Sequence, residues 1–364
     1  MVSFTSEYGW ALLLIGLLAS NDLAVSALEH GDNCVNPVGQ PGKCILFRDC
    51  KPLVEIYKKL SLTPAEESLL RGSRCGTVQY KALVCCAVES QRPTLPVPPA
   101  CGLQLTDRIV GGEETERQEF PWTALIEYKK ADDSFGFHCG GSIINERYVV
   151  TAAHCVSNLP RGWQVRRVRL GEWDLSTEPD CDQIDRKECN DSPIDMDIEE
   201  IIKHTRYDSR DSSKANDIAL IRFARDVAYT DTIRPICLPV SEAIRKMNHE
   251  GVPTFAAGWG KTEWESHSEK KLKVNLTINS LEECSPVYRR SGIILKPTHL
   301  CAGGQRGKDT CLGDSGGPLM RQFAGAWYLL GVVSFGSSKC GASGVSGVYV
   351  KVVEYTDWIQ ENLK

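Results

Sequence analysis

Sixteen cysteines constrain this chain of 364 residues more than any other feature of its sequence. No CxxC pair and no His/Cys cluster at zinc-ligand spacing accompanies them, so metal coordination explains them poorly. An even number of cysteines without such motifs indicates disulfide bonds and therefore an oxidising compartment. Six lie between Cys34 and Cys86, and the other ten are spread from Cys101 to Cys340. We therefore expect a small disulfide-rich module followed by a larger domain.

The composition and the N-terminus indicate a folded, exported protein. Hydrophobic residues make up 42% of the chain, and its net charge of −5 gives no reason to expect nucleic acid or an anionic membrane as a partner. The strongly apolar run Trp10–Ala19 is shorter than the roughly 20 residues that a membrane-spanning helix needs. Small residues follow it up to Ala27, as at signal-peptidase sites. We predict a signal peptide over residues 1–27, no membrane span, and a secreted, extracellular product.

The remaining chain divides into three parts. We expect a small disulfide-rich domain over residues 33–86, a proline-rich linker over 87–108 and a large domain over 109–364. Short β-branched and aromatic runs, separated by Gly, Pro and polar clusters, predict an all-β large domain, and Glu354–Lys364 predicts a short C-terminal helix. The expected strands lie in Arg147–Thr151, Gln164–Leu170, Ile218–Phe223, Trp327–Phe335 and Gly347–Val352.

Three motifs supply the parts of a nucleophilic hydrolase. Such an enzyme needs a hydroxyl nucleophile, an imidazole base, a carboxylate that orients the imidazole, and amide donors for the oxyanion. In chain order, the sequence offers His154 within TAAHC, Asp217 within NDIAL and Ser315 within GDSGGP. Each residue alone has a structural explanation, as a core histidine, a turn aspartate or part of a Gly-rich loop. The three motifs together, in the order His, Asp, Ser, favour catalysis.

With Gly258-Trp259-Gly260 between them, these motifs resemble those of the chymotrypsin-like serine proteases over residues 109–364. The resemblance implies a chymotrypsin-like double β-barrel, and it makes the histidine, aspartate and serine a catalytic triad. It also implies that the amides of Gly313 and Ser315 form the oxyanion hole. Glycine at position 313 lets the backbone approach the reacting atoms without a side chain in the way.

Substrate preference in this family depends on the residue six positions before the nucleophile, which here is Asp309. A buried carboxylate without a cation is costly, so the pocket should select Arg or Lys before the cleaved bond. Gly336 and Gly347 match the pocket-wall glycines that admit a long side chain. The alternative for Asp309 alone is a solvated loop acid. Phe335 and Ser346 depart from the commoner Trp and Pro, which affects finer subsite preferences.

The segment Arg108-Ile109-Val110-Gly111-Gly112 resembles the activation junction of the same family. The resemblance implies an inactive precursor, with 87–108 serving as linker and activation segment. Cleavage after Arg108 would free the amino group of Ile109, which would pair with Asp314 and order the pocket and the oxyanion hole. The alternative is an exposed linker arginine and a turn aspartate. Because Arg108 is basic, the activator should be another trypsin-like protease.

The first cysteine group ends in two adjacent cysteines, which must pair with different partners because vicinal bridging is strained. The sequence alone leaves many connectivities open. The spacing resembles the clip domain of arthropod clip-domain serine proteases of the Easter and prophenoloxidase-activating type, and the alternative is a passive disulfide knot. The resemblance implies the pairs Cys34–Cys85, Cys44–Cys75, Cys50–Cys86, Cys101–Cys237, Cys139–Cys155, Cys181–Cys189, Cys284–Cys301 and Cys311–Cys340.

The acidic loop Gly171–Cys181 concentrates the oxygen ligands that Ca²⁺ requires. It resembles the calcium loop of the family, which implies a structural Ca²⁺ held by Glu172, Asp174, Thr177 and Asp180, some of them through backbone oxygens. The alternative, a solvated acidic turn, stays open.

Other surface features follow from short motifs. Asn190 and Asn275 begin Asn-X-Ser/Thr sequons and predict glycosylation. Two basic groups are candidate exosites for a protein substrate or, alternatively, solvated faces. These groups are Arg161, Arg166 and Arg167, and Lys270, Lys271 and Lys273.

Taken together, the sequence predicts the secreted zymogen of a trypsin-like serine endopeptidase that cuts protein precursors after Arg or Lys. The resemblance implies a haemolymph cascade, such as melanisation through prophenoloxidase activation or Toll-type immune signalling. Expected partners are an upstream protease, a zymogen or cytokine-precursor substrate and a serpin-type inhibitor. One alternative is a clip-domain adaptor that acts by binding, but such homologues usually lose the nucleophile. A digestive trypsin is the other, and digestion needs no clip domain.

Overall fold

The computed structural model describes residues 28–59, 61–87, 94–104, 113–181, 188–261, 267–306, 310, 313–337 and 341–364. The predicted signal peptide lies outside the described residues. The chain forms two compact units, which divide between residues 91 and 92. Within the described ranges, no helix has both the length and the apolar character needed to cross a bilayer.

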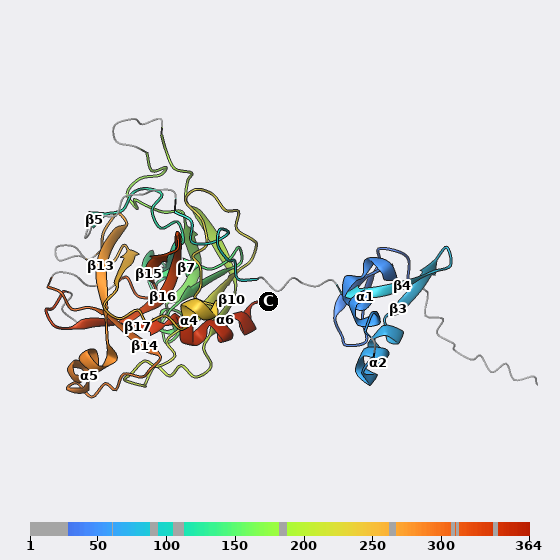
Figure 1. Cartoon of the computed structure of the whole chain (residues 1–364). Helices are drawn as coiled ribbons and strands as arrows, with labels where there is room; N and C mark the ends of the chain where they lie inside the picture. Colours follow the sequence, from blue (N-terminus) through green and yellow to red (C-terminus); the bar gives the residue numbers. More distant parts are fainter. Residues whose placement is uncertain are drawn as a thin grey trace, which may run out of the picture. The chain divides into compact units, whose positions relative to one another are not determined.

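The N-terminal unit is a four-stranded antiparallel sheet with two short helices (Figure 1). Its strands are β1 (Asn33–Val35), β2 (Pro41–Leu46), β3 (Arg74–Val78) and β4 (Lys81–Ala87), in the order β1-β2-β4-β3. The helical segments are η1 (Phe47–Asp49), α1 (Lys51–Tyr57) and α2 (Pro64–Gly72). Thr63 starts α2 with a capping box, in which its hydroxyl accepts from the Glu66 amide and Glu66 accepts from the Thr63 amide. Since few apolar side chains are buried here, three disulfides supply much of the stability.

Six antiparallel strands close the first barrel of the C-terminal unit. In barrel order they are β10 (Ile194–Lys203), β11 (Ala219–Phe223), β8 (Tyr148–Thr151), β7 (Phe135–Ile143), β6 (Thr123–Lys129) and β9 (Gln164–Leu170). The one-turn helix α3 (Ala153–Val156) follows β8 directly. Most side chains of β6, β8 and β11 are buried, which agrees with the apolar runs seen in the sequence.

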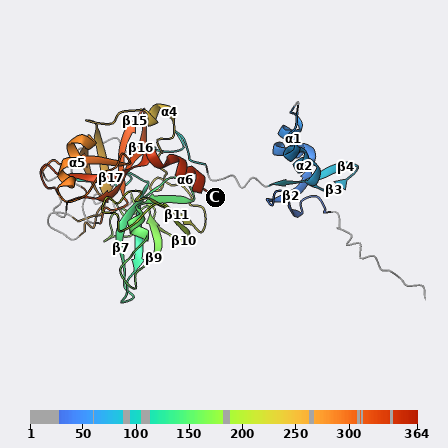
Figure 2. The same ribbon diagram turned by 90° about the horizontal axis from the view of Figure 1, so that it is seen from below.

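The second barrel is a seven-stranded sheet that a β12–β13 pairing closes into a six-stranded ring. Figure 2 shows the first barrel in green and the second in orange and red. In order, the strands of the second barrel are β12 (Pro253–Gly258), β15 (Pro318–Phe323), β16 (Ala326–Phe335), β17 (Ser346–Lys351), β14 (His299–Gly303), β13 (Leu272–Asn279) and the appended β5 (Glu113–Glu114). The remaining helical segments are α4 (Glu242–Arg245), α5 (Leu281–Arg289), η2 (Val352–Tyr355) and α6 (Thr356–Asn362). The predicted all-β double barrel with a C-terminal helix is confirmed.

An aromatic cluster joins the two barrels. Phe120 and Trp122 precede β6, while Phe255 lies on β12 and Trp327 on β16. The ring centroids of Phe120 and Trp327 lie 5.2 Å apart, edge to face, and those of Phe255 and Trp327 lie 5.8 Å apart. Both tryptophans and Phe120 are fully buried, and removing such a ring typically costs about 3–5 kcal/mol. This contact fixes the seam between the barrels, where the loops with the predicted catalytic residues meet.

Candidate active site

His154 and Asp217 come from neighbouring parts of the first barrel. His154 lies in α3 after β8, and Asp217 precedes β11, which pairs with β8. The Nδ1 atom of His154 lies 2.7 Å from Oδ2 of Asp217, and the His154 backbone amide donates to Oδ1 at 2.8 Å. A carboxylate only accepts hydrogen bonds, so Nδ1 of His154 carries the proton. The other ring nitrogen, Nε2, is then left with a lone pair that can accept a proton.

A third donor to the buried aspartate comes from the second barrel. The hydroxyl of Ser334, on β16, donates to Oδ2 of Asp217 at 2.6 Å, and the Asp217 side chain is fully buried. Three hydrogen bonds therefore compensate a carboxylate that water does not reach. Sequence reasoning missed Ser334, although it lies in the segment Val333–Gly336 that also contributes a predicted pocket glycine.

Ser315 lies in a tight loop between the barrels. Gly313 and Gly316 flank it with φ values of +100° and +79°, and the Gly317 amide donates to the Asp314 carbonyl at 2.8 Å. A Cβ on Gly316 would lie 2.2 Å from the Thr151 hydroxyl, so only glycine fits this approach to the first barrel. The Gly140 amide donates to the Ser315 carbonyl at 2.8 Å, and that carbonyl lies 3.6 Å from Sγ of Cys155, the residue after His154. The structure thus brings the predicted nucleophile beside the helix that carries the predicted base.

The predicted oxyanion hole is open to a ligand. Within the part of the chain that the structure describes, neither the Gly313 amide nor the Ser315 amide donates a hydrogen bond to the protein. Buried amides are normally paired, and Ser315 is only half-buried, so these two donors can serve a bound oxygen atom.

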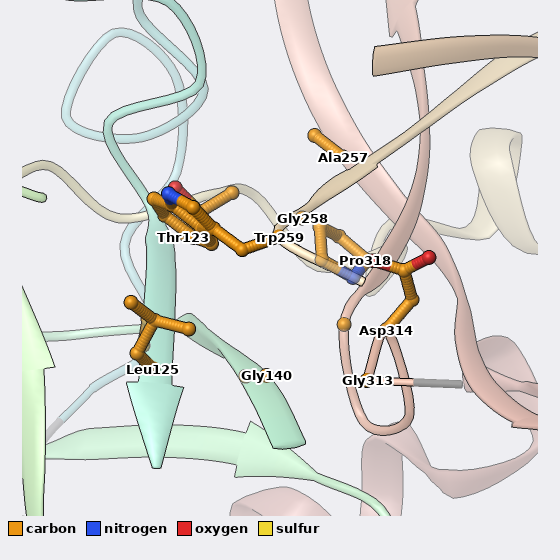
Figure 3. Close-up of a pocket in the computed structure, with 12 residues that line it drawn as sticks. Thr123, Leu125, Gly140, Ala257, Gly258, Trp259, Gly313, Asp314 and Pro318 are labelled. Atoms are coloured by element: carbon orange, nitrogen blue, oxygen red, sulfur yellow. The ribbon is translucent and has the colours of Figure 1, made fainter. Parts of the chain in front are cut away.

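The Asp314 side chain lies beside Gly258 and Trp259 (Figure 3). Its Oδ1 accepts from the Gly260 amide at 2.9 Å. A Cβ on Gly258 or Gly260 would come within about 2.4 Å of the Asp314 carboxylate, which explains both glycines of the Gly-Trp-Gly motif. A cavity of about 10 Å³ lies beside this carboxylate, room for roughly one water molecule. Ile109, which is the predicted partner of Asp314, and Arg108 lie outside the described residues.

Two of the three predicted pocket residues are described. Gly336 follows β16 and Gly347 lies on β17, and a Cβ built on Gly336 would lie 3.7 Å from the Gly347 Cα. The two glycines therefore face each other, and a larger residue at either position would narrow the space between them. Asp309 lies outside the described residues, while the hydroxyl of the next residue, Thr310, lies 2.9 Å from that of Tyr349 on β17.

Comparison with known families decides the identity of this site. The family model described as Trypsin matches residues 109–359, and the model described as Regulatory CLIP domain of proteinases matches residues 34–86. The chain belongs to the clip-domain serine proteases. It is a serine endopeptidase, and the His154–Asp217 pair beside Ser315 lies within the region that matches the trypsin model.

Similar clip-domain serine proteases match along nearly their whole length. The chain is 58% identical to CLIP domain-containing serine protease B4 of Anopheles gambiae, over 97% of this chain and 98% of the relative. It is 38% identical to Melanization protease 1 of Drosophila melanogaster, over 96% and 98%. Among solved structures, the Drosophila Grass clip serine protease of the Toll pathway is similar, with a TM-score of 0.67 and 32% identity over 91% of this chain and 97% of that one.

The disulfide pattern of this clip-domain protease agrees with the predicted pairing. Seven pairs are confirmed, three in the N-terminal unit and four in the C-terminal unit. They are Cys34–Cys85, Cys44–Cys75, Cys50–Cys86, Cys101–Cys237, Cys139–Cys155, Cys181–Cys189 and Cys284–Cys301. Cys311 and Cys340 lie outside the described residues, so their pairing stays a prediction. Cys139 and Cys155 form a potential metal-binding group with His154, but their disulfide leaves no thiolates for a metal.

The predicted calcium loop holds two buried carboxylates close together. Glu172 and Asp180 are buried, and the pKa of Glu172 is raised, first by burial and then by the charge of Asp180. Neighbouring side chains partly compensate the negative charge of these two carboxylates. Arg169 lies 3.3 Å from Glu172, and the Thr177 hydroxyl donates to Asp180 at 2.7 Å. The buried Lys271 also interacts with the charges of Glu172 and Asp180, so a Ca²⁺ ion in this loop stays a prediction that rests on the repulsion between the two carboxylates.

The structure corrects one interpretation of the basic residues. Lys271 and Lys273 are buried, so they belong neither to an exosite nor to a solvated face. Both Oε atoms of Glu119 lie within 2.9 Å of the Lys273 ammonium, and burial lowers the pKa of Lys271 to about 8. The Lys271 ammonium donates to the Thr123 hydroxyl at 3.3 Å, so both lysines face the segment that leads into β6 of the first barrel.

The two sequons differ in accessibility. The side chain of Asn190 is buried and donates to the Arg117 carbonyl at 3.4 Å, whereas Asn275 on β13 is half-buried. A glycan on Asn190 would have to replace that hydrogen bond, so the structure favours Asn275 as the acceptor.

Proposed function

We propose that this clip-domain protease is the secreted zymogen of a trypsin-like endopeptidase that cuts protein precursors after Arg or Lys in an extracellular haemolymph cascade. The observation that carries the catalytic part is the network in which His154, Ser334 and Asp217 are hydrogen-bonded beside Ser315. The cascade is proposed from the names of relatives, one of which is called a melanization protease. A Toll-type cascade rests on the Grass structure.

In the proposed reaction, Nε2 of His154 takes the Ser315 hydroxyl proton while Oγ attacks the carbonyl carbon of the substrate. The negative charge that develops on the carbonyl oxygen is held by the amides of Gly313 and Ser315. The imidazolium then gives its proton to the leaving amine, and the peptide bond breaks to leave an acyl-enzyme. A water molecule repeats the sequence and releases the acid. Asp217 holds the required tautomer throughout and stabilises the imidazolium.

The substrate pocket is proposed to take a long cationic side chain. The facing glycines Gly336 and Gly347 leave the space open, and Asp309 is proposed as the counter-charge at its base. A guanidinium or ammonium that leaves water needs such a partner, since an uncompensated buried charge costs several kcal/mol.

Activation is proposed to follow cleavage after Arg108 by an upstream trypsin-like protease. The freed Ile109 amine is then proposed to pair with Asp314, whose carboxylate the Gly260 amide already contacts. The Cys101–Cys237 disulfide joins the segment before the cleavage site to the catalytic unit, so the clip domain is expected to stay attached and to localise the active enzyme. A serpin-type inhibitor is the proposed partner that ends activity.

One experiment tests the proposal. The purified zymogen is cut after Arg108 and assayed on peptides that differ only in the residue before the cleaved bond, and then on candidate haemolymph precursors. We expect cleavage after Arg and Lys only, and loss of that cleavage in Asp309→Ser. Equal hydrolysis after Phe would contradict the pocket assignment, and an inactive cut enzyme that still binds a cascade component would assign the chain to the clip-domain adaptors.

A further inference from the structure

A second cavity lies next to the proposed oxyanion hole and is separate from the pocket formed by Gly336 and Gly347. It has a volume of about 510 Å³, within the range of sites that bind ligands, and Gly313 lies in its wall. The hairpin of β6 and β7 supplies much of the rest, including Lys130, Phe137 and His138. His138 precedes Cys139, whose disulfide partner Cys155 lies against Ser315.

This position places the cavity on the leaving-group side of the cleaved bond. A substrate that puts its basic side chain between Gly336 and Gly347 and its carbonyl at Gly313 continues past Gly313 after the bond. In an extended peptide, side chains two residues apart point to the same face. The side chain of the second residue after the cleaved bond therefore points to the same face as the basic side chain, and it enters this cavity.

The chemistry of the cavity is apolar at the walls and basic at one side. Phe137, Leu175 and Trp259 contribute apolar surface, and the described residues that line the cavity include no carboxylate. Its nitrogen bases are Lys130, His138 and His267, and His267 lies 3.4 Å from Glu269.

Lys130 is the lysine that lines this cavity, and its charge acts on the carboxylate of Asp132, which lies outside the lining. Its ammonium lies 5.5 Å from the centroid of the Trp163 ring, and it forms no ion pair within the ranges that the structure describes. It is half-buried, which reduces screening by water. The pKa of His138 is lowered, first by burial and then by the charge of Lys130, so His138 is mainly neutral at pH 7.

We propose that Lys130 makes this cavity select an acidic side chain at the second substrate position after the cleaved bond. The apolar walls contact the methylene groups of a glutamate, and the ammonium pairs with its carboxylate. The inference rests on the proposed function, because it assumes cleavage after Arg or Lys. Lys130 is thus a second specificity-determining residue, in addition to Asp309.

The test uses four quenched fluorescent peptides with the same Arg-Ala sequence around the cleaved bond, followed by Glu, Gln, Leu or Lys. With the full-length chain cut after Arg108, kcat/KM for the Glu peptide should exceed that for Gln by about fivefold, the effect of a partly exposed ion pair worth about 1 kcal/mol. The Lys peptide should be the poorest substrate. The ratio of Glu to Gln should fall at 1 M NaCl, because salt screens the pair.

Two variants locate the effect. Lys130→Gln should bring the ratio of Glu to Gln close to one, whereas Lys129→Gln should leave it unchanged, because Lys129 pairs with Asp133 at 2.6 Å and does not line the cavity. Equal rates on all four peptides, or a preference for Leu that survives Lys130→Gln, would overturn the inference while leaving the proposed function intact. Failure of the wild-type enzyme to cut any of the four would overturn the proposed function and this inference with it.

Discussion

Replacement of Lys273 by Met is expected to destabilise the catalytic unit strongly. Lys273 and Glu119 form a buried ion pair, with side chains 5% and 0% exposed and an Nζ–Oε1 distance of 2.8 Å. Removing Lys273 leaves the buried Glu119 carboxylate without the ammonium that contacts it, and breaking a buried pair in this way typically costs about 3–5 kcal/mol. For a domain of this size, about 2–4 °C of melting temperature is lost per kcal/mol, which gives a decrease of about 6–20 °C.

One member of this ion pair lies in the segment that follows the proposed activation site. Glu119 follows β5, in the segment that would become the new N-terminus after the proposed cleavage at Arg108, and Lys273 lies on β13, which pairs with β5. Glu119 also accepts from the Glu116 amide at 2.9 Å. The double variant Lys273→Met/Glu119→Gln should therefore recover most of the lost stability, because it removes the buried charge and keeps an acceptor for that amide.

Thermal and urea unfolding of the zymogen, followed by tryptophan fluorescence in a Ser315→Ala background that prevents self-digestion, measures these changes. Lys246→Met is the matched control, since Lys246 pairs with Glu242 at 2.6 Å but both side chains are at least 75% exposed, and no measurable change is expected. A Lys273→Met protein as stable as wild type, or a double variant no more stable than the single one, would refute the reasoning.

Three further outcomes are expected. Ser315→Ala should remove essentially all peptide hydrolysis after normal cutting at Arg108, because the members of a triad act as a unit, and near-normal kcat/KM would place the nucleophile elsewhere. Arg108→Ala should resist the physiological activator, and the cut wild-type chains should stay together on a non-reducing gel and separate on reduction of Cys101–Cys237. Millimolar Ca²⁺ should raise the melting temperature relative to chelator, less so in Glu172→Gln, and identical midpoints with no metal by elemental analysis would return the loop to a solvated acidic turn.

The parts of the site that the sequence predicts are those with local signatures. Ser315 and its flanking glycines lie within six consecutive residues, because the tight loop itself demands that sequence. Ser334 carries no such signature, since its contact with Asp217 spans 117 positions and depends on how one barrel packs against the other.

The buried lysines were interpreted wrongly for a related reason. Lys is rarely buried, so the closely spaced Lys270, Lys271 and Lys273 favour a solvated surface until their partners are known. The partner of Lys273 is Glu119, 154 positions away, and nothing in the sequence around either residue indicates the other. Pairwise compensation of buried charge is a property of the tertiary fold, and it becomes visible only when β13 and the turn between β5 and β6 are both placed.

The hydrogen bonds across the seam have a consequence for how this enzyme can be controlled. His154 and Asp217 belong to the first barrel, whereas Ser315 and Ser334 belong to the second, and the contacts from Gly140 to Ser315 and from Ser334 to Asp217 cross between them. Neither barrel contains a complete set of reacting groups. The rate of peptide hydrolysis therefore depends on how the two barrels are positioned against each other. A ligand that shifts one barrel by a fraction of a hydrogen-bond length would lower this rate without contacting the substrate.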